Sequence, residues 1–335
     1  MNRNGLKEIK LYVGPMTKNV VDAVIEFANK FNIKIGFIPS RRQIEFDQSG
    51  YVNNWTTRTF MQYIRSKTNL IGLERDHGGP NQGLTNDDGF ASLFQDTQNF
   101  DIVHIDVWKK YPNFDDGVKK TIEYIKYCHN VNHLTLFEVG TEQSIRPFNL
   151  FELDNFLFEL QHNLTNEEFS KILYCVIQSG TSLKGTINTG KYDSVKLKDM
   201  CYIVNKYNIL SKEHNSDFVD INEIYDRYNN GLNAINIAPE FGQIETNCIL
   251  ELINNNAYLL NIFYTICLNS NRWVKWVASN FKPEDNKIEL IKICGHYVLS
   301  DPKMKEIISK FPELSDLVKQ GVFEKLYSIL TPRIS

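Results

Sequence analysis

The chain has 335 residues, with 37 Lys and Arg against 40 Asp and Glu and a formal net charge of −3. Hydrophobic residues make up 42% and charged residues 23%, which is ordinary for a globular protein and excludes a disordered chain. No block of like charge stands out, so we expect no nucleic acid as a partner. The six cysteines form no C-x-x-C pair, which excludes a zinc ribbon or a dithiol redox motif.

Nothing in the sequence predicts a membrane protein. The N-terminal residues lack the apolar core of a signal peptide, and no run of 18 apolar residues could span a bilayer. We therefore expect a cytoplasmic protein with reduced cysteines and no membrane partner.

Short apolar runs alternate along the chain with amphipathic stretches. The runs are rich in Ile, Val, Leu and Phe, as expected of parallel strands buried on both faces. They lie at residues 9–13, 33–38, 70–73, 101–107, 134–139, 173–177, 209–210 and 234–237. Helical patterns lie between them, at 20–31, 56–65, 117–127, 150–160, 167–173, 195–207 and 221–228.

Eight strands that alternate with helices predict a parallel sheet, because parallel neighbours need crossover connections. Eight such units in about 250 residues favour closure into a (β/α)₈ TIM barrel. The alternative is an open doubly wound sheet, but the first strand ends in Gly14-Pro15 and not in a G-x-G-x-x-G loop.

The pattern changes after the eighth strand. From residue 245 onward we expect helices alone, at 248–268, 273–280, 287–298, 303–310 and 314–330. We divide the chain into a barrel at 1–270 and a helical C-terminal extension at 271–335. The extension is expected to be a cap or an oligomer surface without a catalytic group of its own.

Polar side chains crowd the ends of the predicted strands, where barrel enzymes place their active sites. Buried charges near a barrel axis are costly unless they are paired, metal-bound or functional, so we expect a functional pocket there. Structural ion-pair networks are the alternative. The candidates are Arg41, Arg42, Gln43, Asp76, His77, Asp106, Glu138, Glu142, Gln178, Lys212, His214 and Asn236.

Several of these motifs together resemble one family. They are DHGGPN at 76–81, HID at 104–106, VGTE at 139–142, QSG at 178–180, HNSD at 214–217 and HYVLSDP at 296–302. In this order they resemble the D-tagatose-1,6-bisphosphate aldolase subunit family, GatZ/KbaZ, which is related in fold to the class II aldolases. The resemblance covers nearly the whole chain and implies a TIM barrel, a sugar-phosphate substrate and a divalent metal, zinc by preference.

In a class II aldolase a carboxylate moves a proton beside a metal-binding imidazole. The resemblance therefore implies that Asp76 transfers the proton and that His77 and His214 bind metal. A third histidine is missing from strand six, so Glu138 or Glu142 could complete the site. The alternative for Asp76 and His77 is a pair that only stabilises a Gly-Gly-Pro turn. His104 lies inside a strand, where a histidine is more often a hydrogen-bonded core residue than a ligand.

Two arginines depart from the family pattern, in PSRRQIE at 39–45. A guanidinium suits bidentate phosphate binding, and neighbouring side chains point apart, so we expect one of Arg41 and Arg42 to bind the phosphate. Alternatively, both brace the loop through Asp47. The remaining polar residues at strand ends are expected to bind substrate: Gln43, Glu142, Gln178, Lys212 and Asn236. Residues 185–191 imitate a P-loop, but Tyr192 follows where Ser or Thr should bind Mg²⁺, so we expect no kinase activity.

Three functions remain open. The first is an enzyme for metal-assisted C–C cleavage or formation on a phosphorylated ketose. The second is a non-catalytic subunit that supports a class II aldolase catalytic chain. The third is a sugar-phosphate or nucleotide-sugar epimerase or isomerase, in which Asp76, Asp106 or Glu138 abstracts a proton. In each case we expect a homo-oligomer.

Overall fold

A computed structural model describes residues 1–331. Eight parallel strands close into a barrel in the order β1-β10-β9-β6-β5-β4-β3-β2, which confirms the predicted TIM barrel. The strands are β1 (Leu11–Val13), β2 (Ile35–Phe37), β3 (Ile71–Gly78), β4 (Ile102–Ile105), β5 (Leu136–Val139), β6 (Ile172–Ile177), β9 (Leu210–Glu213) and β10 (Ala234–Ile237). The barrel closes where β1 pairs with β10 on one side and with β2 on the other.

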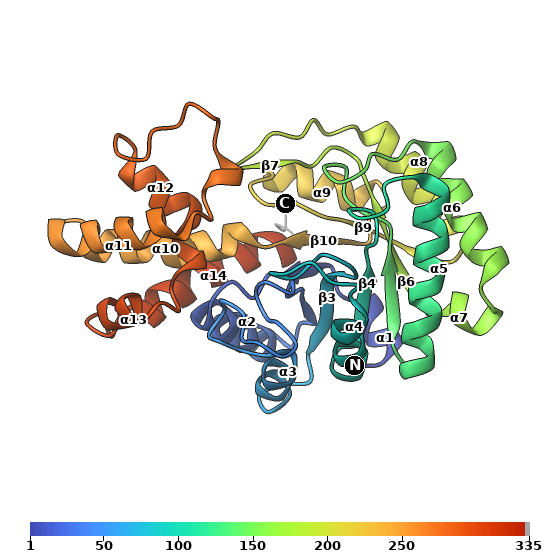
Figure 1. The fold of residues 1–335 in the computed structure, drawn as a ribbon, viewed down its shortest axis with the longest axis horizontal. Helices are drawn as coiled ribbons and strands as arrows, with labels where there is room; N and C mark the ends of the chain where they lie inside the picture. The colour runs from blue at the N-terminus through green and yellow to red at the C-terminus, as the bar shows by residue number, and fades with distance from the viewer. Residues whose placement is uncertain (332–335) are drawn as a thin grey trace.

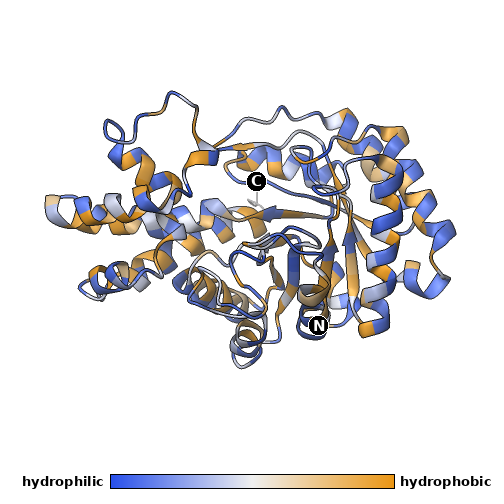
Figure 2. Cartoon of the chain, in the orientation of Figure 1, coloured by the Kyte–Doolittle hydropathy of each residue, from blue (hydrophilic) through white to orange (hydrophobic). Residues whose placement is uncertain are grey.

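Helices surround the barrel and alternate apolar and polar residues along their length, while the strands are largely apolar (Figure 2). They are α2 (Lys18–Phe31), α3 (Thr57–Arg65), α4 (Phe90–Asn99), α5 (Phe114–Val131), α6 (Leu150–Asn163), α7 (Asn166–Ser170), α8 (Ser194–Lys206), α9 (Ile221–Asn229) and α10 (Pro239–Ile253). Local sequence fixes several of their ends: Thr17, for example, accepts a hydrogen bond from the Val20 N–H and so caps α2.

A short N-terminal helix, α1 (Arg3–Lys7), closes the end of the barrel where the strands begin. Leu6 is buried in the same apolar cluster as Tyr12 and Tyr174 inside the barrel, and the Tyr174 hydroxyl donates to the Leu6 carbonyl. The interior of the barrel is therefore closed at this end by α1 and opens at the other end, where the strands finish.

The chain after β10 contains helices, turns and loops, and no strand among the described residues. It comprises α11 (Ala257–Ser270), the 3₁₀ turn η1 (Val274–Trp276), α12 (Lys287–Cys294), the 3₁₀ turn η2 (Gly295–Tyr297), α13 (Pro302–Ile308) and α14 (Leu314–Leu330). The helices α11, α12 and α13 project from the side of the barrel opposite α5, α6 and α7 (Figure 1). No helix in residues 1–331 is long and apolar enough to cross a membrane.

The final helix α14 returns to the barrel. Phe323 of α14 packs edge-on against Phe27 of α2 at 5.2 Å between ring centroids, and Lys319 forms an ion pair with Glu26 of the same helix. On its other side Lys325 of α14 pairs with Glu240 of α10. The division of the chain at residue 270 stays a prediction, but α14 covers the barrel like one of its own helices.

Some predicted elements differ from the structure. Residues 273–280 do not form a helix, because only the 3₁₀ turn η1 is present there. Residues 248–268 belong to two helices, α10 and α11, which separate at the run Asn254-Asn255-Asn256. Helix α4 was not predicted, and its N-cap Gly89 makes no side-chain cap. Residues 185–191 form the turn and second strand of a short antiparallel hairpin, β7 (Leu183–Lys184) and β8 (Ile187–Asn188), and the segment that follows it, so the P-loop likeness has no structural basis.

Candidate active site

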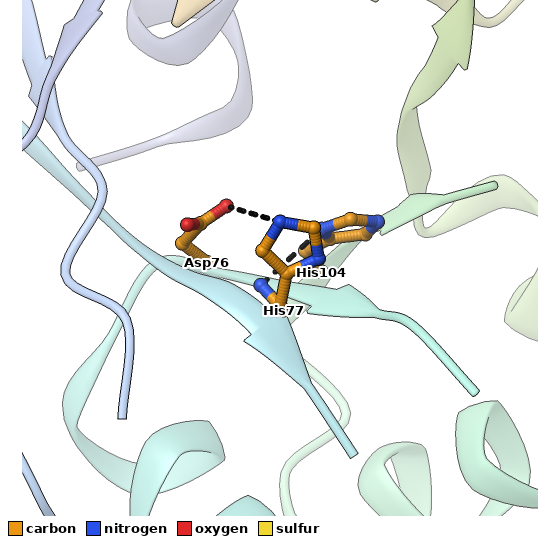
Figure 3. A group of neighbouring side chains, drawn as sticks. All are labelled: Asp76, His77 and His104. Atoms are coloured by element: carbon orange, nitrogen blue, oxygen red, sulfur yellow. Dashed lines mark hydrogen bonds and ion pairs between the residues drawn. The ribbon is translucent and has the colours of Figure 1, made fainter. Parts of the chain in front are cut away.

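An irregular strand end brings Asp76 and His77 to the same place. Side chains of adjacent residues in a regular strand point to opposite faces. In β3 the register with β4 shifts between Arg75 and Gly78, and His77 adopts a left-handed backbone with φ of 47°. As a result both Asp76 and His77 line the cavity at the ends of the strands (Figure 3).

The His77 ring is oriented by a buried carboxylate. Its Nδ1 lies 2.6 Å from Oδ2 of Asp106, and the Thr141 hydroxyl donates to the same oxygen. The other oxygen, Oδ1, accepts a hydrogen bond from the Trp108 N–H. Burial alone would lower the pKa of His77, but the negative charges of Asp76 and Asp106 raise it well above its usual range. Burial opposes ionisation of Asp106, yet the hydrogen bond and charge of His77 lower the pKa of its carboxyl. With Nδ1 engaged, Nε2 of His77 faces Asp76 Oδ1 at 3.7 Å.

His214, the residue that follows β9, repeats this arrangement. Its Nε2 lies 2.9 Å from Oε1 of the fully buried Glu138, and its Nδ1 lies 3.9 Å from Oδ1 of Asp76. The His77 and His214 ring centroids are 5.5 Å apart. Two imidazole nitrogens therefore converge on one side of Asp76, and each ring has a buried carboxylate behind it, as metal-binding histidines commonly do.

His104 is a framework residue. Its Nδ1 accepts a hydrogen bond from the His77 backbone N–H at 3.3 Å (Figure 3). Its Nε2 donates to the Gly140 carbonyl at 3.0 Å. The ring is fully buried, and burial lowers its pKa. Both nitrogens are engaged by the backbone, so His104 holds the end of β3 in place and leaves no lone pair for a ligand.

The donor set that fits a divalent cation is His77, Glu142 and His214, whose ligand atoms all lie within 4.8 Å of one another. Two other groupings within residues 1–331 use His104, whose nitrogens are already engaged. Glu142 accepts hydrogen bonds from Asn215 Nδ2 and the Ser144 hydroxyl, which hold its carboxylate in place. Two imidazoles and one carboxylate are a donor set that Zn²⁺ accepts, with room for substrate. We call Asp76, His77, Glu142 and His214 the acid–histidine cluster.

A buried ion pair supports the cluster from inside the barrel. Lys212 Nζ lies 2.6 Å from Glu74 Oε2 and 3.0 Å from Glu138 Oε2, and 3.9 Å from the Tyr12 ring centroid. Burial and the charge of Glu138 raise the pKa of Glu74 well above its usual range, while Lys212 and His214 lower that of Glu138 despite burial. Lys212 thus lies between two buried carboxylates and is the cation that both of them contact. Lys212, Glu138 and Asp106 are fully buried and do not line the cavity.

The remaining predicted residues divide into two groups. Gln43, Arg42 and Asn236 line the cavity with the acid–histidine cluster. Gln178 does not, because its amide holds the loop after β5: it accepts from the Phe148 N–H and donates to the Thr141 and Arg146 carbonyls.

The adjacent arginines have different partners. Arg41 is buried in ion pairs with Glu45 and Asp87, away from the cavity, whereas Arg42 lines it. The expectation that only one of the two faces the pocket agrees with this placement. Bracing through Asp47 is not seen: the structure pairs Arg41 with other carboxylates, and the Asp47 side chain accepts from the Gln48 N–H.

The cavity has a volume of about 530 Å³, and part of its wall comes from the extension, which sequence reasoning missed. Arg272, Lys275, Trp276 and Tyr297 all line it. A signal was present in the run NRWVKW at 271–276, which places two cations and two tryptophans where only a helix of the extension was predicted.

Comparison with known proteins supports the fold. No protein-family model matches the sequence, and neither does any curated protein. Among solved structures, a probable tagatose 6-phosphate kinase from Sinorhizobium meliloti 1021 is similar with a TM-score of 0.71 at 14% identity, over 96% of this chain and 98% of that one.

Two further solved structures are similar over most of their length. The fructuronate-tagaturonate epimerase UxaE from Cohnella laeviribosi has a TM-score of 0.61 at 11% identity, over 96% of this chain and 81% of that one. A fructose-bisphosphate aldolase from Campylobacter jejuni has a TM-score of 0.60 at 10% identity, over 98% and 91%. At these identities the likeness establishes the barrel with its C-terminal helices.

Proposed function

We propose that this chain is a metal-dependent enzyme that cleaves or forms a C–C bond in a phosphorylated ketose. The observation that carries the proposal is the convergence of His77 Nε2 and His214 Nδ1 beside Asp76, with a buried carboxylate behind each ring. The resemblance of the motifs to the tagatose-bisphosphate aldolase subunits and the aldolase among the similar structures support the same reaction class.

His77, His214 and Glu142 would hold the divalent cation, for which zinc is our first choice. When bound, such a cation supplies positive charge to the carbonyl and enediolate oxygens of the substrate. Asp106 and Glu138 keep the two rings oriented, so their role is to position ligands and not to abstract a proton from substrate.

Asp76 is the only one of the three predicted catalytic carboxylates that lines the cavity. In the cleavage direction its carboxylate accepts the proton of the hydroxyl group β to the ketose carbonyl. The bond between the α and β carbons then breaks, the β carbon leaves as an aldehyde, and the electron pair stays on the enediolate. In the reverse direction Asp76 returns the proton to the new hydroxyl group.

The test combines metal analysis with an assay for retro-aldol cleavage of a panel of ketose phosphates by the purified chain alone. We expect stoichiometric metal and release of triose phosphate, both lost in His77→Ala, with turnover alone lost in Asp76→Asn. A chain that binds metal but turns over nothing until a class II aldolase chain is added would favour the supporting-subunit function instead.

An epimerase is the second candidate, because Glu142 lines the cavity together with Asp76. Inversion at a carbon requires removal of a proton from one face and its return to the other, which two separate carboxylates can perform. Epimerised sugar without cleavage in the same assay would establish this reaction. We do not propose kinase activity, because the β7–β8 hairpin provides no phosphate-binding loop between a strand and a helix. A homo-oligomeric state and a cytoplasmic location stay predictions.

A further inference from the structure

Three cations line one cavity without a carboxylate partner. They are Arg42, from the segment after β2, and Arg272 and Lys275, from the segment after α11. None of them takes part in an ion pair within residues 1–331, whereas Arg41, Arg75, Arg146 and Arg227 all do. We call Arg42, Arg272 and Lys275 the cation cluster.

Aromatic rings and the backbone hold the cation cluster in place. The Arg272 guanidinium lies over the Tyr51 ring at 4.6 Å from its centroid, and Lys275 Nζ lies 4.1 Å from a ring centroid of Trp276. Arg42 Nε donates to the Gly83 carbonyl. Rings do not neutralise a positive charge, so these contacts orient the cations and leave their charge available to an anion.

The three charges lie close enough to repel one another. Lys275 is exposed as a whole, but partial desolvation of its ammonium in the cavity wall, together with the positive charges of Arg42, Lys109 and Arg272, lowers the pKa of Lys275 to about 8, although Glu142 opposes the shift. Like charges gathered at one cavity raise the free energy of the empty site. A bound anion would remove that cost.

We propose that Arg42, Arg272 and Lys275 form a subsite for the anionic end group, phosphate or carboxylate, of an open-chain sugar whose carbonyl lies at the acid–histidine cluster. The position of the sugar carbonyl at the acid–histidine cluster rests on the proposed function, whereas the binding of an anion by the cation cluster does not. The cavity of about 530 Å³ is of the size that holds a small-molecule ligand. The extension therefore completes the substrate site and determines specificity.

The test is calorimetric titration of the full chain with inorganic phosphate, a ketose phosphate, a sugar acid and a neutral ketose. We expect Arg272→Ala and Lys275→Ala each to weaken the binding of the anionic ligands by about tenfold or more. Neutral ketose should bind equally to all variants. The matched control is Lys282→Ala, because Lys282 is an exposed lysine of the same extension that does not line the cavity. Whether the phosphate or the acid binds more tightly identifies the anion.

Absence of anion binding by the wild-type chain, or equal binding by wild type and both variants, would overturn the subsite. An equal loss in Lys282→Ala would do the same, since it would show only a general charge effect. Metal content measured on the same variants distinguishes failure of the anion subsite from failure of the proposed function. Arg272→Ala and Lys275→Ala should retain metal, whereas His77→Ala should lose metal and still bind inorganic phosphate.

Discussion

In one part of the cavity wall, charged groups lie behind the surface in fixed pairs, as Asp106 does with His77 and Glu138 with His214. Elsewhere in the cavity wall, Arg42, Arg272 and Lys275 face the cavity without ion-pair partners among the described residues. The first part is built from strands, and the second mainly from a segment that contains only a 3₁₀ turn. The difference indicates that the strand ends hold geometry for chemistry, while the added segment supplies charge for recognition.

The largest contrast concerns stability. Replacing Lys212 with Met removes the cation that lies between the buried carboxylates of Glu74 and Glu138, which should lower the free energy of unfolding by about 3–5 kcal/mol. The matched control is Lys206→Met, which removes an exposed ion pair with Asp154 and should cost about 1 kcal/mol or less. Lys275→Met should also leave stability nearly unchanged. Urea denaturation measures the free energy of unfolding of all three variants. Similar losses of stability in Lys212→Met and Lys206→Met would contradict a special role for the buried ion pair.

The second prediction concerns metal at the acid–histidine cluster. His77→Ala and His214→Ala should each weaken divalent metal binding by more than about 100-fold, because each removes a nitrogen ligand directly, a larger change than loss of a supporting group. Metal content after dialysis, with circular dichroism to check folding, measures this. His133→Ala is the control, since His133 is exposed and remote from the cavity. Unchanged metal content in both variants would rule out the site.

A smaller effect is expected from the residue behind the ligand. Asp106→Asn keeps the shape of the side chain but removes the charge that orients the His77 ring, so metal affinity should fall by about 10–100-fold. Asp115→Asn, on the surface at the start of α5, should leave affinity unchanged. Competition with a chelator measures the metal dissociation constants of both variants. Equal metal affinities in wild type and Asp106→Asn would show that the Asp106 carboxylate does not affect metal binding by His77.

The smallest effect is a pH dependence of the cation cluster. The Lys275 ammonium, with a pKa of about 8, is charged below that pH and neutral above it. Sulfate binding should therefore weaken several-fold as the pH rises from 7 to 10. A bound anion stabilises the ammonium, so it will raise the pKa of Lys275 in the complex. Lys275→Arg should remove the dependence, because a guanidinium stays charged throughout. Calorimetry across the pH range measures it, and an identical pH profile in both proteins would count against a role for Lys275.

Sequence periodicity was enough to predict the barrel and most of the acid–histidine cluster. Buried parallel strands show as apolar runs, and their carboxyl ends must meet at one end of a barrel, so Asp76, His77 and His214 could be grouped. The position of Lys212 was not predicted correctly. The predicted strand ended at residue 210, which put Lys212 in the loop after it, whereas β9 extends to Glu213 and buries Lys212 inside the barrel. No periodicity connects Arg272 or Lys275 to the barrel, since their position depends on how the segment after α11 folds back.

The return of α14 to the barrel has a consequence for the order in which the chain is made. Helix α2 presents Phe27 and Phe31, and their aromatic partners Phe323 and Tyr327 belong to α14, at the far end of the sequence. A ribosome completes α2 and then all eight barrel strands before it reaches α14, so the aromatic face of α2 stays without its α14 partners until after the barrel can close. Contacts of such high sequence separation also form slowly. Helix α2 is therefore the surface at which a chaperone would be needed, until the last helix covers it.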